Sequence, residues 1–190
     1  MGERKRRKEK GLTTKKKTIG FAELTHSSKD QAKQHDNQDE IKEKQAIAFL
    51  QAGKPKEAEV IYRELIAKGS QNHIAYGNLA SIYLMRGDKS QGINLLKNAL
   101  KLKPDFPEAL NNLGNALQEQ GNLNAASSSF KQAIKYKPDF PIAHYNLGIV
   151  LEKQANHSAA ISSFQQALKL KPNFPEAHHN IGIAFLLRGD

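Results

Sequence analysis

Residues 107–140, PEALNNLGNALQEQGNLNAASSSFKQAIKYKPDF, decide the fold, because the flanking sequence repeats their pattern at a fixed spacing. A forward shift of 34 residues keeps a leucine, a glycine, two alanines, a phenylalanine and a proline in register. The first set is Leu113, Gly114, Ala126, Phe130, Ala133 and Pro138, and its counterparts are Leu147, Gly148, Ala160, Phe164, Ala167 and Pro172. The chain is therefore built from a repeated unit.

The same period extends in both directions with substitutions. One step back gives Leu79, Ala80, Gly92, Leu96, Ala99 and Pro104, and a second step gives Gln45, Ala46, Ala58, Tyr62, Leu65 and Ser70. One step forward from 141–174 reaches Ile181 and Gly182. We therefore expect a tail (1–38), a divergent first repeat (39–72), three further repeats (73–106, 107–140 and 141–174), and the first helix of an incomplete fifth (175–190).

Each unit is predicted to contain two helices joined by a turn. Pro107 suits the first position of a helix and Gly121 suits the left-handed turn that ends one, so a helix is expected over 107–120. A second helix over 124–136 must end before Pro138, because proline disfavours helical geometry in the residue before it. Small residues such as Gly114 and Ala126 are expected where the two helices cross at about 8 Å.

A 34-residue period with a small residue early, two alanines in the second half and a proline near the end resembles the tetratricopeptide repeat. The resemblance covers most of the chain and implies an all-α fold, an alpha-alpha superhelix of antiparallel helix pairs, whose first helices line a concave groove. The segments 58–68 (AEVIYRELIAK) and 111–121 (NNLGNALQEQG) are also similar to cyanobacterial members of the family.

Composition limits the other function classes. The 190 residues include no cysteine and no apolar run near membrane-spanning length, so we expect a cytoplasmic chain without disulfides. Residues 1–20 contain nine of the basic side chains against Glu3 and Glu9, whereas the rest of the chain is close to balanced. We interpret 1–38 as a disordered basic tail that aids solubility. Binding of the tail to nucleic acid, an anionic membrane or a nuclear import receptor is the alternative.

Catalytic signatures are missing from the sequence. There is no phosphate-binding glycine loop, no pair of histidines spaced for a metal around a glutamate, and no cysteine nucleophile. We therefore expect neither enzyme activity within these residues nor a metal or cofactor. His144 and His178 occupy the same point of successive repeats, where a packing role is expected. The serines at 127–129 and 162–163 are expected on a solvated face of second helices.

A column of asparagines at the 34-residue period is the candidate site. By resemblance it lines the concave groove, and each amide can both donate to and accept from a peptide main chain. Helices about 9–10 Å apart match roughly three residues of an extended strand. A similar ladder occurs in the repeat arm of protein O-GlcNAc transferases. The predicted groove residues are Asn78, Asn112, Asn146, Asn180, Asn111, Asn115, Tyr145, Ile149, Lys153 and His179.

Asparagine is also common at this point of the repeat whatever is bound, so a purely structural role stays open. We predict a protein-interaction scaffold that binds an extended peptide or a partner protein in the groove; a nucleic-acid partner is not expected. A second hypothesis makes the array the substrate-recruiting arm of a larger enzyme, such as a glycosyltransferase or sulfotransferase. Because segment 175–190 lacks a partner helix, we expect either a longer chain or self-association through this helix.

Overall fold

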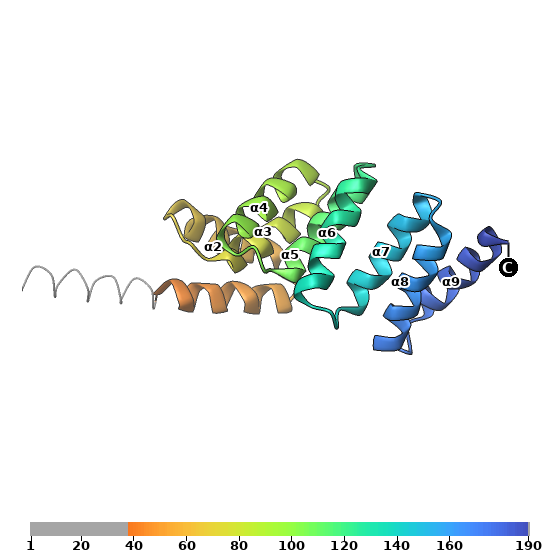
Figure 1. Cartoon of the computed structure of the whole chain (residues 1–190). Helices are drawn as coiled ribbons and strands as arrows, with labels where there is room; N and C mark the ends of the chain where they lie inside the picture. Colours follow the sequence, from red (N-terminus) through yellow and green to blue (C-terminus); the bar gives the residue numbers. More distant parts are fainter. Residues whose placement is uncertain (1–37, 190) are drawn as a thin grey trace, which may run out of the picture. The chain divides into compact units, whose positions relative to one another are not determined.

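The structure is a computed structural model that describes residues 38–189, and its regular elements within that range are all α-helices (Figure 1). This confirms the all-α prediction. The helices discussed below belong to one compact unit that begins at Ile41. The predicted disorder and basic character of the tail concern residues that, up to position 37, lie outside the described part.

Helices follow one another along this unit with short turns between them (Figure 1). A helical stretch over 41–51 comes first. It is followed by α2 (Pro55–Ala67), α3 (His73–Met85), α4 (Lys89–Leu102), α5 (Pro107–Glu119), α6 (Leu123–Tyr136), α7 (Pro141–Lys153), α8 (His157–Leu170) and α9 (Pro175–Arg188). The helices expected over 107–120 and 124–136 are thus confirmed to within one residue as α5 and α6.

Two different capping signals mark the helix starts. Helices α5, α7 and α9 each begin at a proline that follows a phenylalanine. Proline suits this position because the first amide of a helix has no acceptor within the helix. Helices α6 and α8 begin after Asn122 and Asn156, whose side-chain oxygens accept the backbone N–H of Ala125 and Ala159 at 3.3 Å.

The turn between the two helices of a pair uses the left-handed backbone region. Gly87 and Gly121 adopt φ of 85° and 79° there, but the same position before α8 is Ala155, with φ 58°. A residue with a Cβ pays about 1–2 kcal/mol in this region. The fourth repeat therefore tolerates local strain that the glycine-containing turns avoid.

Close contact between a glycine and a ring joins the helices of the α5–α6 and α7–α8 pairs. A Cβ placed on Gly114 would lie 2.6 Å from the ring of Phe130, and one on Gly148 would lie 2.5 Å from the ring of Phe164. Both rings are fully buried. In the α3–α4 pair the roles are exchanged, because the glycine is Gly92 on α4 and the large side chain is Leu84 on α3.

The core runs from one helix pair into the next. One buried cluster joins α6, α7, α8 and α9 through Ala126, Phe130, Leu147, Val150, Leu151, Ala160, Ile161, Phe164 and Ala184. Because its members come from successive pairs, no pair completes its apolar core alone. The neighbours must stack, which is the property of a solenoid.

Three of the serines expected on a solvated face are buried instead. Ser127, Ser129 and Ser163 are at most 9% exposed, whereas Ser128 and Ser162 are exposed. The hydroxyls of Ser129 and Ser163 donate to the carbonyl oxygens four residues earlier, at 2.9 and 3.0 Å. A serine satisfied by its own helix in this way can be buried at low cost, so the prediction was wrong for these positions.

We predict opposite effects of one substitution at equivalent glycines. Gly114→Ala and Gly148→Ala should each destabilise the protein by about 1–3 kcal/mol, because the new methyl group overlaps a buried ring. Gly182→Ala, at the same register in α9, should stabilise by about 0.5–1 kcal/mol, because a Cβ there meets no atom within 4 Å. Urea unfolding followed by circular dichroism measures all three, and equal effects at the three glycines would contradict the packing described here.

Candidate binding groove

A cavity of about 350 Å³ opens between the first helices of two successive pairs, α3 and α5. The first helices α3, α5, α7 and α9 contact one another in that order. The cavity is lined by Ser81, Leu84 and Met85 of α3 and by Asn112, Asn115, Ala116 and Glu119 of α5. Two of the residues predicted for the groove, Asn112 and Asn115, therefore line one hollow.

Each asparagine of the 34-residue column donates a side-chain hydrogen bond to a helix earlier in the chain. The donors and acceptors are Asn78 Nδ2 to Tyr62 Oη at 2.9 Å, Asn112 Nδ2 to Ser81 Oγ at 3.3 Å, Asn146 Nδ2 to Asn111 Oδ1 at 3.0 Å, and Asn180 Nδ2 to Tyr145 Oη at 3.0 Å. The column thus fastens each first helix to the preceding part of the array.

These bonds use only part of the hydrogen-bonding capacity of each amide. An asparagine has two N–H groups and one acceptor oxygen. Within residues 38–189 no protein donor bonds to the Oδ1 atoms of Asn78, Asn112, Asn146 and Asn180, and these side chains are half-buried. The same amide can therefore hold the array together and accept a hydrogen bond from a ligand.

The two tyrosine acceptors stay protonated at neutral pH. Burial raises the pKa of Tyr62 and of Tyr145 above the usual value for a phenol, although the hydrogen bonds from Asn78 and Asn180 act in the opposite direction. Tyr145 also packs its ring against Phe164 and Phe174, at centroid distances of 5.8 and 4.8 Å. In the structure Tyr145 therefore supports the start of α9 through Phe174 and accepts the hydrogen bond from Asn180.

The remaining predicted groove residues differ in their accessibility. Asn111 is only 6% exposed and accepts the bond from Asn146, so it lies inside the array, in contrast to the surface position expected for it. Ile149 is half-buried and packs against the cluster that joins α6 to α9. Lys153 and His179 are exposed. The structure brings Asn112 and Asn115 together in the cavity and distributes the others along the array.

The predicted groove residues did not include Ser81, Leu84, Met85 and Ala116, which also line the cavity. Met85, at the end of α3, is 73% exposed. A signal for it exists, because the sequence of α3, HIAYGNLASIYLM, is apolar on every side, and a helix with one buried face must then expose some apolar residue. Its position beside Asn112 could not be derived from that signal.

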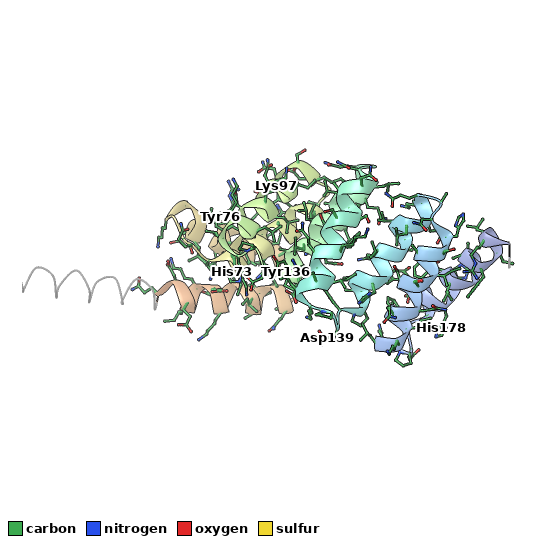
Figure 2. All side chains as sticks on the ribbon, in the orientation of Figure 1. His73, Tyr76, Lys97, Tyr136, Asp139 and His178 are labelled. Carbon is green, nitrogen blue, oxygen red and sulfur yellow. The ribbon has the colours of Figure 1, made fainter. Side chains whose placement is uncertain are left out.

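His144 and His178 were expected to pack in the core, but the structure places them at the turns before α7 and α9. The Nε2 atoms of these residues lie 2.9 Å from the carbonyl oxygens of Pro138 and Pro172, each six residues earlier. His178, labelled in Figure 2, is exposed. The imidazole N–H thus satisfies a turn carbonyl before α7 and α9, which explains the periodic recurrence better than core packing does.

Neither a metal site nor a membrane-spanning helix is found in the described part of the chain. Within 38–189 no three His, Asp or Glu side chains gather closely enough to hold a metal ion. No helix in the same range has both the length and the apolar character needed to cross a bilayer.

Comparisons with known proteins agree with the repeat pattern. A family model described as tetratricopeptide repeat matches residues 43–93 and 111–175, and a second, described as TPR repeat, matches 80–121. A search of curated proteins found no match.

Solved structures of other repeat proteins share the fold. A crystal structure of MamA is 24% identical, with a TM-score of 0.71, over 80% of this chain and 82% of that one. MamA from Desulfovibrio magneticus RS-1 is 19% identical, with a TM-score of 0.71, over 80% and 86%. Pseudomonas aeruginosa pilF is 21% identical, with a TM-score of 0.72, over 80% and 69%. At such identities the likeness shows the fold alone.

We predict that Asn146→Ala destabilises the protein by about 1–3 kcal/mol, because it leaves the buried Asn111 oxygen without a donor. Asn180→Ala should cost less, because the Tyr145 hydroxyl is half-buried and water can replace the lost bond. In the double variant Asn111→Ala/Asn146→Ala, much of the loss should be recovered. A double-mutant cycle measured by urea unfolding checks this, and strictly additive losses would contradict the inter-helix bond.

Proposed function

The chain belongs to the tetratricopeptide repeat family, and we propose that the first helices of its solenoid bind an extended peptide segment of a partner protein. The partner is held by its main chain, with one apolar side chain inserted between α3 and α5. The fold class and family favour a protein-interaction scaffold. The residues of the cavity supply hydrogen-bonding and apolar groups that could contact a peptide.

The observation that carries the proposal is the state of the Asn112 side chain. It lines the cavity, its Nδ2 is held by Ser81 Oγ, and Ser81 Oγ in turn donates to the Gly77 carbonyl at 3.1 Å. The Asn112 oxygen is therefore fixed in orientation while it has no donor from residues 38–189. A fixed acceptor costs little entropy when a peptide N–H binds to it.

The rest of the cavity favours an apolar side chain of moderate size. Leu84, Met85 and Ala116 supply its apolar wall, and an exposed methionine adapts its shape readily to different partners. The carboxylate of Glu119 is neutralised by Lys89, whose Nζ lies 2.9 Å from Oε2. Charge at this cavity is therefore balanced, and we infer that the groove selects its peptide by main-chain hydrogen bonding and apolar fit.

We predict that peptides selected from a random display library against this chain lose about tenfold in affinity for Asn112→Ala/Asn115→Ala, because a fixed acceptor and its neighbour are removed. Fluorescence anisotropy with a labelled peptide measures the change. The matched control is Ser158→Ala/Ser162→Ala, which alters exposed side chains on α8 and should leave the affinity unchanged.

N-methylation of the peptide separates main-chain from side-chain recognition. If asparagine oxygens hold peptide N–H groups, methylation at some backbone positions should weaken binding as much as the double asparagine variant does. A peptide that tolerates N-methylation throughout, or that loses affinity for the serine control, would contradict the proposal.

Self-association through α9 stays a prediction. Leu186 and Leu187 are 77% and 55% exposed on this helix. If a second copy covers them, sedimentation velocity should show a dimer that grows with concentration, and Leu186→Glu should abolish it. A monomer at all concentrations up to the millimolar range would refute this contact.

A further inference from the structure

The second helices of three successive pairs carry only one sign of charge. Helices α4, α6 and α8 contain six lysines and neither aspartate nor glutamate. Lys89 pairs with Glu119. The other five, Lys97, Lys101, Lys131, Lys135 and Lys169, are exposed and form no ion pair within residues 38–189; Lys97 is labelled in Figure 2. Although charge is nearly balanced over the array as a whole, α4, α6 and α8 are therefore basic.

A second cavity, of about 530 Å³, lies against the middle one of these helices. Its lining comprises Asn124, Ser127, Ser128, Lys131, Gln132 and Lys135 of α6, Leu151 and Gln154 near the end of α7, and Asn156 at the start of α8. Every side chain in this lining except Leu151 can donate a hydrogen bond, and none is acidic. The cavity is thus distinct from the groove between α3 and α5.

The sequence at one register position explains why the space exists in this repeat. Ser127 occupies the position of Ile93 in α4 and Ile161 in α8, both of which are buried. A hydroxymethyl group in place of an isoleucine leaves the volume of the missing methyl and methylene groups unfilled. Among α4, α6 and α8, only α6 has a small residue at this position, and the cavity lies beside it.

Ser127 also differs from the other buried serines. It is 6% exposed, yet within residues 38–189 its hydroxyl has no hydrogen-bond partner. Ser129 and Ser163 satisfy their hydroxyls within their own helices. Within residues 38–189 the one buried side-chain polar atom without a partner is His157 Nδ1, so the Ser127 hydroxyl is open to the cavity. It is therefore available to hydrogen-bond a ligand atom.

The amides of the lining are partly held in position. Gln154 Nε2 donates to Asn124 Oδ1 at 2.8 Å, and Asn156 Oδ1 accepts the Ala159 backbone N–H. The Asn156 amide nitrogen remains available as a donor. Lys131 and Lys135 lie one helical turn apart, which places their Cβ atoms about 5–6 Å from each other.

We propose that this cavity binds a phosphate monoester carried by a side chain of a partner protein. Its charge of nearly −2 matches the two unpaired ammonium groups, and its three terminal oxygens can accept from both lysines and from the Ser127 hydroxyl. A carboxylate would leave one lysine uncompensated. The partner is a phosphorylated protein segment that docks on the second helices. These helices are basic, whereas charge is balanced at the groove between α3 and α5.

Two other polyanionic partners fit the lining less well. Binding of single-stranded nucleic acid relies on aromatic side chains that stack on bases, and this cavity has no aromatic residue. A membrane surface requires apolar side chains that can enter the lipid, whereas the one apolar lining residue, Leu151, is 8% exposed.

The test uses N-acetyl-O-phosphoserine N-methylamide as the probe, titrated into the ¹⁵N-labelled chain at constant ionic strength. The probe is expected to cause saturable chemical-shift changes in the amide resonances around Ser127, Lys131 and Asn156. The unphosphorylated compound should cause none. The variant Lys131→Gln/Lys135→Gln should weaken binding about tenfold or more, because two charge-assisted hydrogen bonds are lost.

Two matched variants separate a site from diffuse attraction. Lys97→Gln/Lys101→Gln removes the same charge at the same register of α4, where Ile93 fills the space, and should leave the affinity unchanged. Ser127→Ile keeps both lysines but fills the cavity, and should abolish saturable binding. Circular dichroism confirms that each variant is folded.

Several outcomes would overturn the proposal. An equal loss for the α4 lysine pair, or wild-type binding by Ser127→Ile, would show that only diffuse charge is at work. Inorganic phosphate bound as tightly as the probe would assign the cavity to the free ion. If the probe gives no saturable change and an oligonucleotide shifts the amide resonances around the lysines of α4, α6 and α8, the surface would be assigned to nucleic acid.

Discussion

The contact between a glycine on one helix and a buried ring on its partner is the constraint on which this structure depends. Gly114 and Gly148 admit the rings of Phe130 and Phe164 at distances that no other residue would allow. This contact fixes the spacing of the α5–α6 and α7–α8 pairs, whereas Gly92 and Leu84 bring α3 and α4 together. Because buried clusters contain residues from successive pairs, the spacing within one pair also determines how the next pair packs against it.

Side-chain hydrogen bonds from the first helices to earlier helices reinforce this packing. The asparagine column uses its amide nitrogens to fasten one helix to the preceding part of the array and keeps its oxygens available. The structural and the ligand-binding interpretations of the column are therefore compatible in physical terms. The second helices have a different chemistry, because their unpaired lysines and the space left by Ser127 favour an anionic group.

The fold could be predicted from the sequence because it depends on residue size at a fixed period, as Gly114 and Phe130 illustrate. The candidate site was harder to predict, because its geometry depends on which neighbours a polar side chain meets. Asn111 and Asn112 look alike in sequence, yet one is a buried acceptor and the other lines a cavity. His144 reaches a turn carbonyl. Ser129 donates to a carbonyl of its own helix, whereas Ser127 lines a cavity. Such differences arise from contacts between helices, which periodicity does not specify.

The most direct test of this account is native-state hydrogen exchange of the amides in α5, α7 and α9, which share one register. Slow exchange is predicted at Gly114 and Gly148, where a ring from the second helix covers the first. Much faster exchange is predicted at Gly182, where no neighbouring helix places an atom within 4 Å of a Cβ. Equal protection at the three glycines would contradict the claim that the glycine–ring contact holds the array together.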